Sequence, residues 1–236
     1  MFRTATLAGL VLAALAVSAF ADKEQDDKKD KDKDKPKAKV YKTPQDVFDA
    51  FVVAGQKDDH KTVAALLAPQ AQKDVAAILA ILIGADRPML EESKEEDAQK
   101  LLKTFKPVYD TMDKHGVTVK VLEKVKKSKD KKEMEKSKKA VLAVIKDPEA
   151  FIVDVMTAVD KLGFGGEKAK TKEELKDLKI DGDKAKGTLV RTTKFEDKES
   201  VKKEPIEFVK INGSWRVIPT FDLDEGDEKK DEKKDK

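Results

Sequence analysis

The sequence predicts an α+β fold in which N-terminal helices pack on a curved C-terminal antiparallel β-sheet. From Val40 to about Gly166, apolar residues recur at helical spacing behind helix-start signals. After Thr171 the spacing changes to the alternation and turn signals of strands. Helices grouped ahead of an antiparallel meander are typical of α+β rather than alternating α/β proteins. Residues 40–221 suffice for a single domain with one core, since a chain of this size buries roughly 70% of its unfolded surface.

Composition excludes several classes of protein. Of the 236 residues, 41% are charged and 39% are hydrophobic, whereas an average soluble domain is about 25% charged. The net charge of +3 is too small for a whole-chain electrostatic fit to nucleic acid. A sequence without Cys has no disulfides, thiol catalysis or thiolate metal sites, and two distant His cannot form a multi-histidine centre. We therefore expect no metal and no cofactor, and the sequence identifies no catalytic residue.

Residues 1–21 have the pattern of a secretory signal peptide. Arg3 precedes a charge-free apolar stretch, and the closing Ala-Phe-Ala matches an Ala-x-Ala cleavage site. The apolar centre, Leu7 to Val17, is shorter than the ~20 residues that a membrane-spanning helix needs. Cleavage before Asp22 is therefore favoured over an uncleaved anchor. We expect an exported protein, periplasmic or extracellular, without a membrane anchor after cleavage.

Two charged arms flank the predicted domain. Residues 22–39 hold 8 Lys and 7 acidic residues, and residues 222–236 hold 5 Lys and 8 acidic residues. Segments with so few large apolar side chains cannot offset their conformational entropy, so both arms are predicted to be disordered. Their nearly balanced charges favour solubilising spacers over anchors for an anionic surface, because a polybasic anchor needs unopposed Lys or Arg.

The domain is predicted to open with two helices. Thr43 caps the first helix, Pro44 occupies its first position, and Gly55 ends it. Its apolar residues form one stripe: Val47, Phe48, Phe51 and Val52. A second, short helix follows the capping pair Asp58 and Asp59. The apolar residues of that helix are Val63, Leu66 and Leu67.

A third helix is predicted to form the centre of the core. Pro69 can open this helix and Gly84 can stop it. Between them, Val75 to Ile83 is a run of nine consecutive apolar residues. A helix that is apolar all round is buried all round, and nine residues are too few to span a bilayer.

Two longer helices are predicted next. The first opens with a capping box at Ser93 to Glu96 and ends at His115. Because its apolar stripe continues across Pro107, we expect one kinked helix rather than two separate helices. The second opens at Asp147-Pro148 and ends in the loop Gly163 to Gly166.

The C-terminal third carries strand and turn signals. Leu178 and Ile180 lead into the turn Asp181-Gly182-Asp183, after which an extended, Thr-rich run begins. Residues 206–218 form a hairpin around Asn212-Gly213, which is the strongest short hairpin signal. Pro205 suits only a strand start or an edge strand, because it has no N–H to donate.

These motifs resemble those of secreted bacterial members of the nuclear-transport-factor-2-like superfamily. The resemblance lies in Thr43 to Phe51, Lys57 to His60, Val63 to Leu67, Ile180 to Ala185 and Phe208 to Val217. It implies a curved antiparallel sheet wrapped around helices, with a cone-shaped cavity between them. Members include ketosteroid isomerases, dehydratases and many domains without a known reaction, so the fold alone selects no activity. A Lys-rich helical insertion at about residues 117–166 departs from the family pattern and could fill or cover the cavity mouth.

Arg191 is the first candidate for a ligand contact. On a strand it shares a face with Ala185, Gly187 and Leu189, so an inward-facing strand would direct the guanidinium into the cone. There it could bind a carboxylate or a phosphate. The alternative is that a bulge or a frayed strand end directs Arg191 to solvent.

Four further residues are candidates that also have simpler structural explanations. Tyr109 and Trp215 could line the same pocket, but a tyrosine on a helical stripe and a lone tryptophan are more often core residues. Catalytic members of the superfamily place an acid or a His-Asp pair in the cone. Asp59 and His60 are adjacent, yet Asp59 is better explained as a helix cap and the ring as packing. His115 is better explained as a helix-end cation.

The segment Lys120 to Lys139 contains 10 Lys and 4 acidic residues. Binding to an anionic polymer is one explanation, but the lysines are not interleaved with aromatic residues and the chain has only four Arg. At most a weak, salt-sensitive attraction is expected, with no specific nucleic-acid recognition. A solvated helix face is favoured. The overlapping residues Val117 to Val125 fit a strand or a helix, and both remain open.

The sequence thus predicts an exported, non-catalytic binding or accessory domain whose partner is an unknown small molecule or protein. The alternative is a cone-pocket enzyme of the isomerase, dehydratase or hydrolase type. A second alternative is a weak, Lys-rich binder of anionic polymers. A polar pocket with a titratable group would favour the enzyme, and a filled cone would disfavour it.

Overall fold

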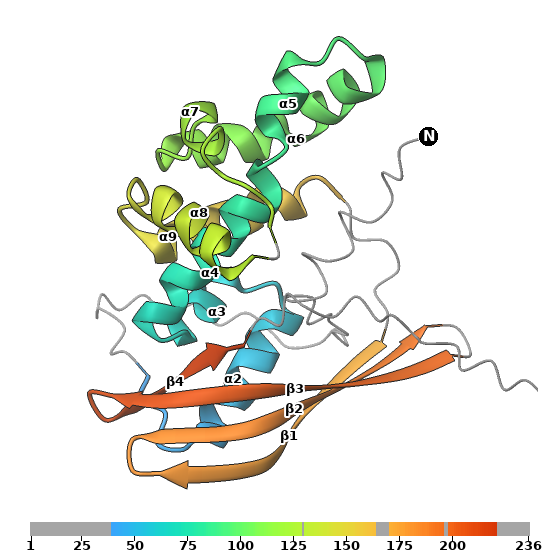
Figure 1. Ribbon diagram of the computed structural model, residues 1–236. Coiled ribbons are helices and arrows are strands. Elements are labelled where there is room, and N and C mark those ends of the chain that lie inside the picture. The colour runs from blue at the N-terminus through green and yellow to red at the C-terminus, as the bar shows by residue number, and fades with distance from the viewer. Residues whose placement is uncertain (1–38, 129, 164–169, 196–197, 221–236) are drawn as a thin grey trace, which may run out of the picture.

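The computed structural model describes residues 39–128, 130–163, 170–195 and 198–220 (Figure 1). It confirms the α+β class: helices come first in the chain, and a four-stranded antiparallel sheet forms its C-terminal part. The predicted signal peptide, nearly all of the first charged arm and the charged tail lie outside the described residues. Across the described residues, none of the helices combines the length and the apolar character needed to cross a membrane.

The helices follow one another with short connections. Their bounds are α2 Pro44–Gln56, α3 His60–Leu66, α4 Pro69–Gly84, α5 Arg87–Glu92, α6 Glu96–Lys114, α7 Val119–Leu122, α8 Lys131–Leu142 and α9 Pro148–Asp160. Residues 117–125, which the sequence left open, therefore contain a short helix and no strand. The predicted continuity across Pro107 is confirmed, because α6 is one helix with this proline inside it.

Polar side chains cap four of these helices: the sequence predicts three of the caps but not the one at Asp130, which starts α8. Thr43 and Asp46 form a capping box in which each side chain accepts the other residue's backbone N–H at 3.1 Å. Asp59 accepts the N–H of Thr62 at 3.0 Å, and Asp147 accepts that of Ala150 at 3.0 Å. Each cap satisfies an N–H group that has no partner within its helix.

Two predicted helix boundaries are wrong. The sequence predicts a capping box at Ser93, but α6 begins at Glu96 after Glu95, which makes no side-chain cap. Ser93 instead ends α5, and its hydroxyl accepts the N–H of Glu95 at 3.2 Å. The short helix α5 was not predicted, and it occupies the residues just before the expected cap. Gly55 does not end α2, which continues to Gln56.

The strands form a meander with the order β1-β2-β3-β4. Their bounds are β1 Lys170–Asp181, β2 Lys184–Phe195, β3 Lys198–Ile211 and β4 Ser214–Pro219. Both predicted turns are confirmed, and the left-handed φ values of Asn212 (50°) and Gly213 (80°) are those of a type I′ hairpin turn. The sequence underestimates the length of β1 and β3, because their outer halves are charged and lack the usual strand pattern.

A β-bulge divides β1. The pairs Lys176↔Thr188 and Lys179↔Lys186 leave two residues of β1 opposite Gly187 alone, and Asp177 has a φ of 53°. Glycine is required at 187, because a Cβ there would lie 2.7 Å from Leu175 Cδ1 and 3.1 Å from the Lys176 carbonyl oxygen. Because of the extra residue in β1, the residues of β1 before the bulge pair with β2 one position away from the register of an unbroken hairpin.

The helices form a layer on the sheet, and one contiguous apolar cluster runs through both. Helix α2 packs against β4 and β1, and α4 packs against β4. At the outer edge of β4, Ala68 N–H donates to the Val217 carbonyl at 2.9 Å, and Arg216 Nη1 donates to the Ala65 carbonyl at 2.5 Å. The sheet is therefore fixed to the helices mainly through its shortest strand.

The Lys-rich insertion does not cover the sheet. Helix α8 packs on α4, and α9 packs on α3, α4 and α6. Figure 1 shows α7, α8 and α9 in the helical layer, on the side away from the strands. The reason is the apolar face of α9, whose buried residues are Phe151, Ile152, Val155, Met156, Ala158 and Val159. The end of the predicted insertion, including Gly166, lies outside the described residues.

The cap at Asp59 should make the stability depend on pH. Hydrogen bonds from Thr62, from its side chain first and then its backbone, lower the pKa of Asp59. Because the pKa of Asp59 is lower in the folded than in the unfolded chain, the ionised carboxylate stabilises the fold at pH values above the unfolded-state pKa. This stability is lost as the pH falls through the folded-state pKa. We expect Asp59→Ala to lower the free energy of unfolding by about 1 kcal/mol at pH 7.

Denaturant titrations at several pH values measure this effect, with Glu92→Ala as the exposed control. The difference between Asp59→Ala and the unmutated chain should disappear as the pH falls below about 4. A difference that persists unchanged at pH 2 would show that the cap does not act through the carboxylate.

Candidate functional site

A polar cluster lies on the sheet around Arg191. Its strand presents Ala185 and Arg191 on the same face, which we call the inner face because Ala185 and the neighbouring Phe208 are buried there. In the paired register, Arg191 stands between Glu173 of β1 and Lys202 of β3. Arg191 thus lies on the side of the sheet that also carries Ala185, which is one of the two alternatives that the sequence left open.

The guanidinium is bound by carboxylates of the chain itself. Arg191 Nε donates to Glu173 Oε1 at 2.7 Å, and Nη1 donates to Glu204 Oε2 at 3.4 Å. The side chains of Arg191 and Glu173 are 15% and 3% exposed. Lys202 adds a second cation, with its Nζ 2.7 Å from Glu204 Oε1. An anionic ligand at Arg191 would have to displace Glu173, which makes the cluster primarily a cross-strand connection.

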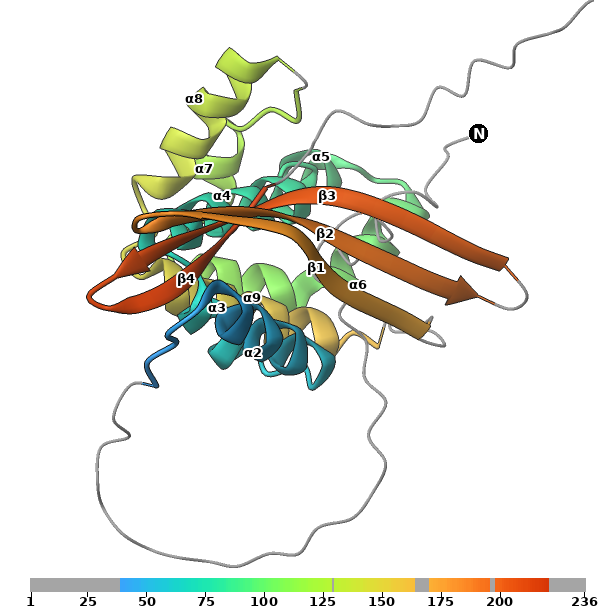
Figure 2. The same cartoon turned by 90° about the horizontal axis from the view of Figure 1, so that it is seen from below.

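This cluster lies where the sheet extends beyond the helical layer (Figures 1 and 2). We call this part the projecting sheet: residues 170–176 of β1, 188–195 of β2 and 198–205 of β3. Next to the cluster, its inner face carries a row of hydroxyls from Thr171, Thr193 and Ser200, which are paired across the three strands. The projecting sheet thus presents polar and charged side chains toward its free end, whereas its paired residues Leu175 and Leu189 pack against the apolar core.

Tyr109 lies in a different part of the molecule, on α6. It is buried, and burial is the main reason that its pKa rises to about 12. The Arg87 guanidinium carbon lies 5.0 Å from the ring centroid. Arg87 also donates to both carboxylate oxygens of Asp113, at 2.7 and 2.9 Å, and to Glu91 at 2.8 Å. This network connects α5 to α6, so Tyr109 is a structural residue.

Trp215 lies in a third place, on β4. It is buried, and its backbone N–H donates to the Tyr41 carbonyl at 2.9 Å. The Tyr41 N–H donates in turn to Ser214 Oγ at 3.0 Å. These bonds join the segment before α2 to the sheet. The structure does not bring Arg191, Tyr109 and Trp215 into one pocket.

Both histidines pair with α9. His60 Nε2 lies 2.5 Å from Asp160 Oδ2, and His115 Nε2 lies 2.9 Å from Asp154 Oδ2. The predicted capping role of Asp59 is confirmed by its bonds to Thr62. The sequence missed both His–Asp pairs, since their partners lie 100 and 39 residues away in the chain.

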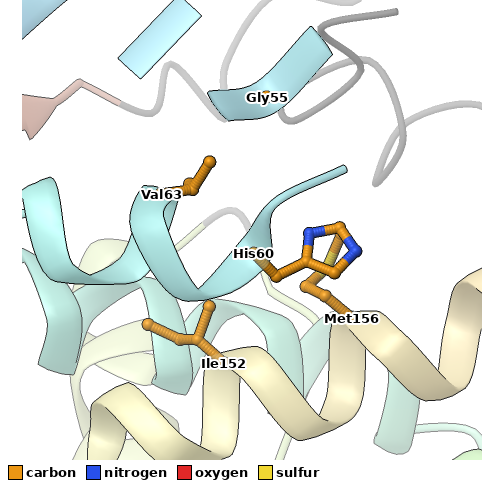
Figure 3. A pocket seen from close by; sticks show the side chains of 5 residues that line it. All are labelled: Gly55, His60, Val63, Ile152 and Met156. Atoms are coloured by element: carbon orange, nitrogen blue, oxygen red, sulfur yellow. The ribbon is translucent and has the colours of Figure 1, made fainter. Parts of the chain in front are cut away.

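A small cavity lies beside His60 (Figure 3). It has a volume of about 20 Å³ and is lined by Gly55, His60, Val63, Ile152 and Met156. That volume holds about one water molecule. Four of these five residues offer no polar side-chain group other than a thioether sulfur, so among the described residues that line the cavity only His60 contributes a group suited to proton transfer.

Within the described ranges, no group of three or more His, Cys, Asp or Glu side chains could hold a metal ion. Comparison with known protein-family models, with curated proteins and with solved structures finds no match. The function must therefore be argued from the geometry of this chain.

Removing Arg191 should destabilise the protein strongly. Arg191→Ala leaves the Glu173 carboxylate buried without its cation, and we expect the free energy of unfolding to fall by about 2–4 kcal/mol. The double variant Arg191→Met/Glu173→Leu should lose less free energy of unfolding than Arg191→Ala, because it leaves neither member of this pair as an unpaired buried charge. Chemical denaturation measures both.

The exposed pair Lys186–Glu207 is the matched control, with its Nζ 2.7 Å from the carboxylate oxygen. Lys186→Ala should cost less than about 1 kcal/mol. If Arg191→Ala proved as mild as Lys186→Ala, the cross-strand cluster would not be the connection described above.

Proposed function

We propose that this chain is an exported, non-catalytic binding or accessory domain, and that the projecting sheet is its binding surface. One observation carries the proposal: the projecting sheet presents a polar inner face beyond the helical layer, while the groups best suited to chemistry are paired internally. Arg191 is bound to Glu173, and each imidazole is bound to a carboxylate of α9. A face of this kind suits contact with a partner surface better than enclosure of a substrate.

The partner is a protein or a small molecule that matches hydroxyl and charged groups. The hydroxyl row and the Arg191 cluster span three strands, so a protein surface would reach more of them at once than a small ligand. Three paired strands hold these side chains in fixed positions. Preorganisation of this kind lowers the entropic cost of binding.

The cone-pocket enzyme has less support. The pair of His60 and Asp160 has the groups of a general base and its orienting acid. The adjacent cavity, however, holds about one water molecule and lies among α2, α3 and α9 rather than on the sheet. A substrate of ordinary size would need a pocket of roughly 300 Å³ or more.

We propose that the fold is related to the nuclear-transport-factor-2-like superfamily. The proposal is based on the sequence motifs that resemble that superfamily. The motifs that support this proposal are the capped opening helix, the break before α3 and the closing Asn-Gly hairpin. The superfamily pattern of helices followed by an antiparallel sheet agrees with the order of elements. The apolar filling between α2 and β4 argues against an open cone: Val47, Phe48, Phe208 and Val217 are all buried.

Site-specific photo-cross-linking tests the binding surface. A benzophenone amino acid replacing Thr193 on the inner face should yield a discrete adduct when the protein is exported by its own organism. The same group replacing Lys103, an exposed residue of α6, should yield none. The mass of the mature chain should show that it begins at Asp22.

Two results would count against the proposal. Equal adducts from both positions would indicate non-specific contact. The other result is that the benzophenone amino acid gives no adduct at position 193 or at position 171 under conditions where free benzophenone reacts. In that case the projecting sheet would not be the binding surface.

A separate observation supports a second candidate function, which is attraction to anionic polymers. Six exposed lysines of the α7–α8 region form no ion pair with another described residue: Lys120, Lys124, Lys131, Lys132, Lys136 and Lys139. Figure 2 shows α8 standing at the margin of the molecule, away from the projecting sheet. Such a patch attracts polyanions through counterion release and loses affinity steeply with salt.

Heparin chromatography distinguishes this candidate from a solvated helix face. If the patch binds polyanions, the unmutated chain is retained near physiological salt and the triple variant Lys131→Glu/Lys132→Glu/Lys136→Glu elutes markedly earlier. Lys57→Glu/Lys61→Glu, on the α2–α3 side, should change elution little. Flow-through of the unmutated chain at physiological salt would discard the candidate.

A further inference from the structure

The outer half of β3 is an open edge of the sheet. Strand β4 has six residues and pairs only with residues 206–211 of β3, which has 14. Residues 198–205 pair with β2 on one side, and no described strand lies on the other. Residues 199–203 are all exposed, and Figure 2 shows this part of β3 along the margin of the projecting sheet. An edge of this kind presents unpaired N–H and C=O groups to another strand.

The backbone groups that face this edge can be identified. The Thr220 hydroxyl donates to the Pro205 carbonyl, so the Pro205 backbone faces the side of β4. Backbone direction alternates along an antiparallel strand, so Lys203, Val201 and Glu199 direct their N–H and C=O groups to the open edge. Pro205 ends this set, because it has no N–H to offer there.

The opposite margin of the sheet is less suited to pairing with a further strand. Strand β1 forms that margin, and the bulge between Lys176 and Lys179 interrupts it. A bulge protects an edge because it twists the strand away from a potential partner. The outer half of β3, in contrast, pairs with β2 without a register shift. Its edge is therefore continuous.

The side chains of this edge are complementary to a second copy of the same edge. An antiparallel pairing centred on Val201 places the two Val201 side chains opposite each other and Glu199 of each copy opposite Lys203 of the other. Opposite charges directly across an antiparallel pair stabilise it. Lys203 forms no ion pair with another described residue. Glu199 lies 3.0 Å from Lys194, but its side chain is 50% exposed, so it can accept a second cation.

Other registers of the same pairing lose this complementarity. A shift of two residues places Val201 opposite a charged residue. A shift of four places Lys203 opposite Lys203 or Glu199 opposite Glu199. Charged side chains on an edge normally discourage pairing with other strands. Here the same charges select one register and one partner, which is the same strand of a second copy.

We propose that two copies of this chain pair antiparallel through residues 199–203 of β3, with a twofold axis at Val201. The three residues whose backbone groups face the edge would form about six hydrogen bonds across the interface. The helical layer leaves the projecting sheet uncovered (Figures 1 and 2). Antiparallel pairing therefore places the helical layers of the two copies at opposite ends of the joined strands. The contact is short, so we expect a weak, reversible dimer with a dissociation constant of roughly 10 µM to 1 mM.

This dimer would extend the polar surface of the projecting sheet. Side chains directly opposite each other in an antiparallel pair lie on the same face, so the inner faces of the two copies would form one continuous surface. That surface would carry two Arg191 clusters and two rows of hydroxyls. The inference does not depend on the proposed function, because the pairing uses the edge of β3 and leaves the inner face accessible.

Sedimentation equilibrium and amide hydrogen exchange of the purified protein test the proposal. The weight-average mass should rise toward that of a dimer between about 20 µM and about 1 mM. Over the same range, exchange at the amides of Glu199, Val201 and Lys203 should slow severalfold. The amides of Ser200 and Lys202 face β2, so their exchange should not depend on concentration and reports that the sheet is folded.

Charge reversal identifies the interface. Lys203→Glu and Glu199→Lys each place like charges opposite each other twice, so each variant alone should be a monomer over this range. An equal mixture of the two variants restores both opposite-charge pairs and should form a mixed dimer. The matched control is Lys103→Glu, which makes the same charge change as Lys203→Glu at an exposed position of α6. It should leave the dimer unchanged.

Four results would overturn the proposal. The first is a protein that is still a monomer at about 1 mM. The second is a dimer that Lys203→Glu leaves intact, which would assign the association to another surface. The third is a mixture of the two charge-reversed variants that stays monomeric. The fourth is slow exchange at the edge amides at every concentration, because the edge would then be covered within one molecule.

Discussion

The need to bury α4 on every side organises the molecule. This helix carries nine consecutive apolar residues, and most of its residues are inaccessible to solvent. At roughly 25 cal/mol per Å², leaving any of its sides in water would cost several kcal/mol. Strand β4 covers one side, and α8 and α9 cover others. At its end, a Cβ on Gly84 would lie 2.7 Å from Met112 Cε and 2.8 Å from Leu122 Cδ2, which shows how closely α6 and α7 approach. The Lys-rich insertion therefore acts as part of the cover of α4.

Helix α9 is held by polar contacts at its margins as well as by its apolar face. His60 and His115 each pair with one of its aspartates, and Gln72 of α4 donates to Glu149 at 3.3 Å. The His115 ring also meets Phe151 edge-on, with centroids 5.4 Å apart. These contacts restrict both sliding of α9 along its axis and rotation of α9 about that axis. Apolar packing alone would restrict these two movements only weakly.

Local signals explain what the sequence could predict. The caps at Thr43, Asp59 and Asp147 and the Asn-Gly turn depend on residues within four positions of one another, so they could be found without the fold. The class of fold follows from their order. Ser93 shows the limit of such signals, because a serine can end one helix as readily as it starts the next.

The partners of Arg191 show what the sequence could not predict. Counting back from the turn at Gly182 in an unbroken hairpin places Glu174 opposite Arg191. The bulge at Asp177 shifts the register, so Glu173 takes that position instead. No residue in the bulge signals this shift by its type alone, since aspartate is common in ordinary turns. The face of Arg191 was therefore one of two alternatives that the sequence left open, whereas the carboxylate that neutralises it could not be predicted.

The position of the bulge also separates two parts of the sheet with different constraints. Between the bulge and the turn at Gly182, the length of the strands is limited by the packing of the sheet against α2 and by the pairing of β3 with β4. Beyond the bulge, Leu175 and Leu189 still pack against the core, and the Arg191–Glu173 pair follows them, so only the strand ends beyond this pair could change in length without disturbing these contacts. The tip of the sheet, beyond the Arg191 cluster, is where the molecule could change size at least cost to its stability.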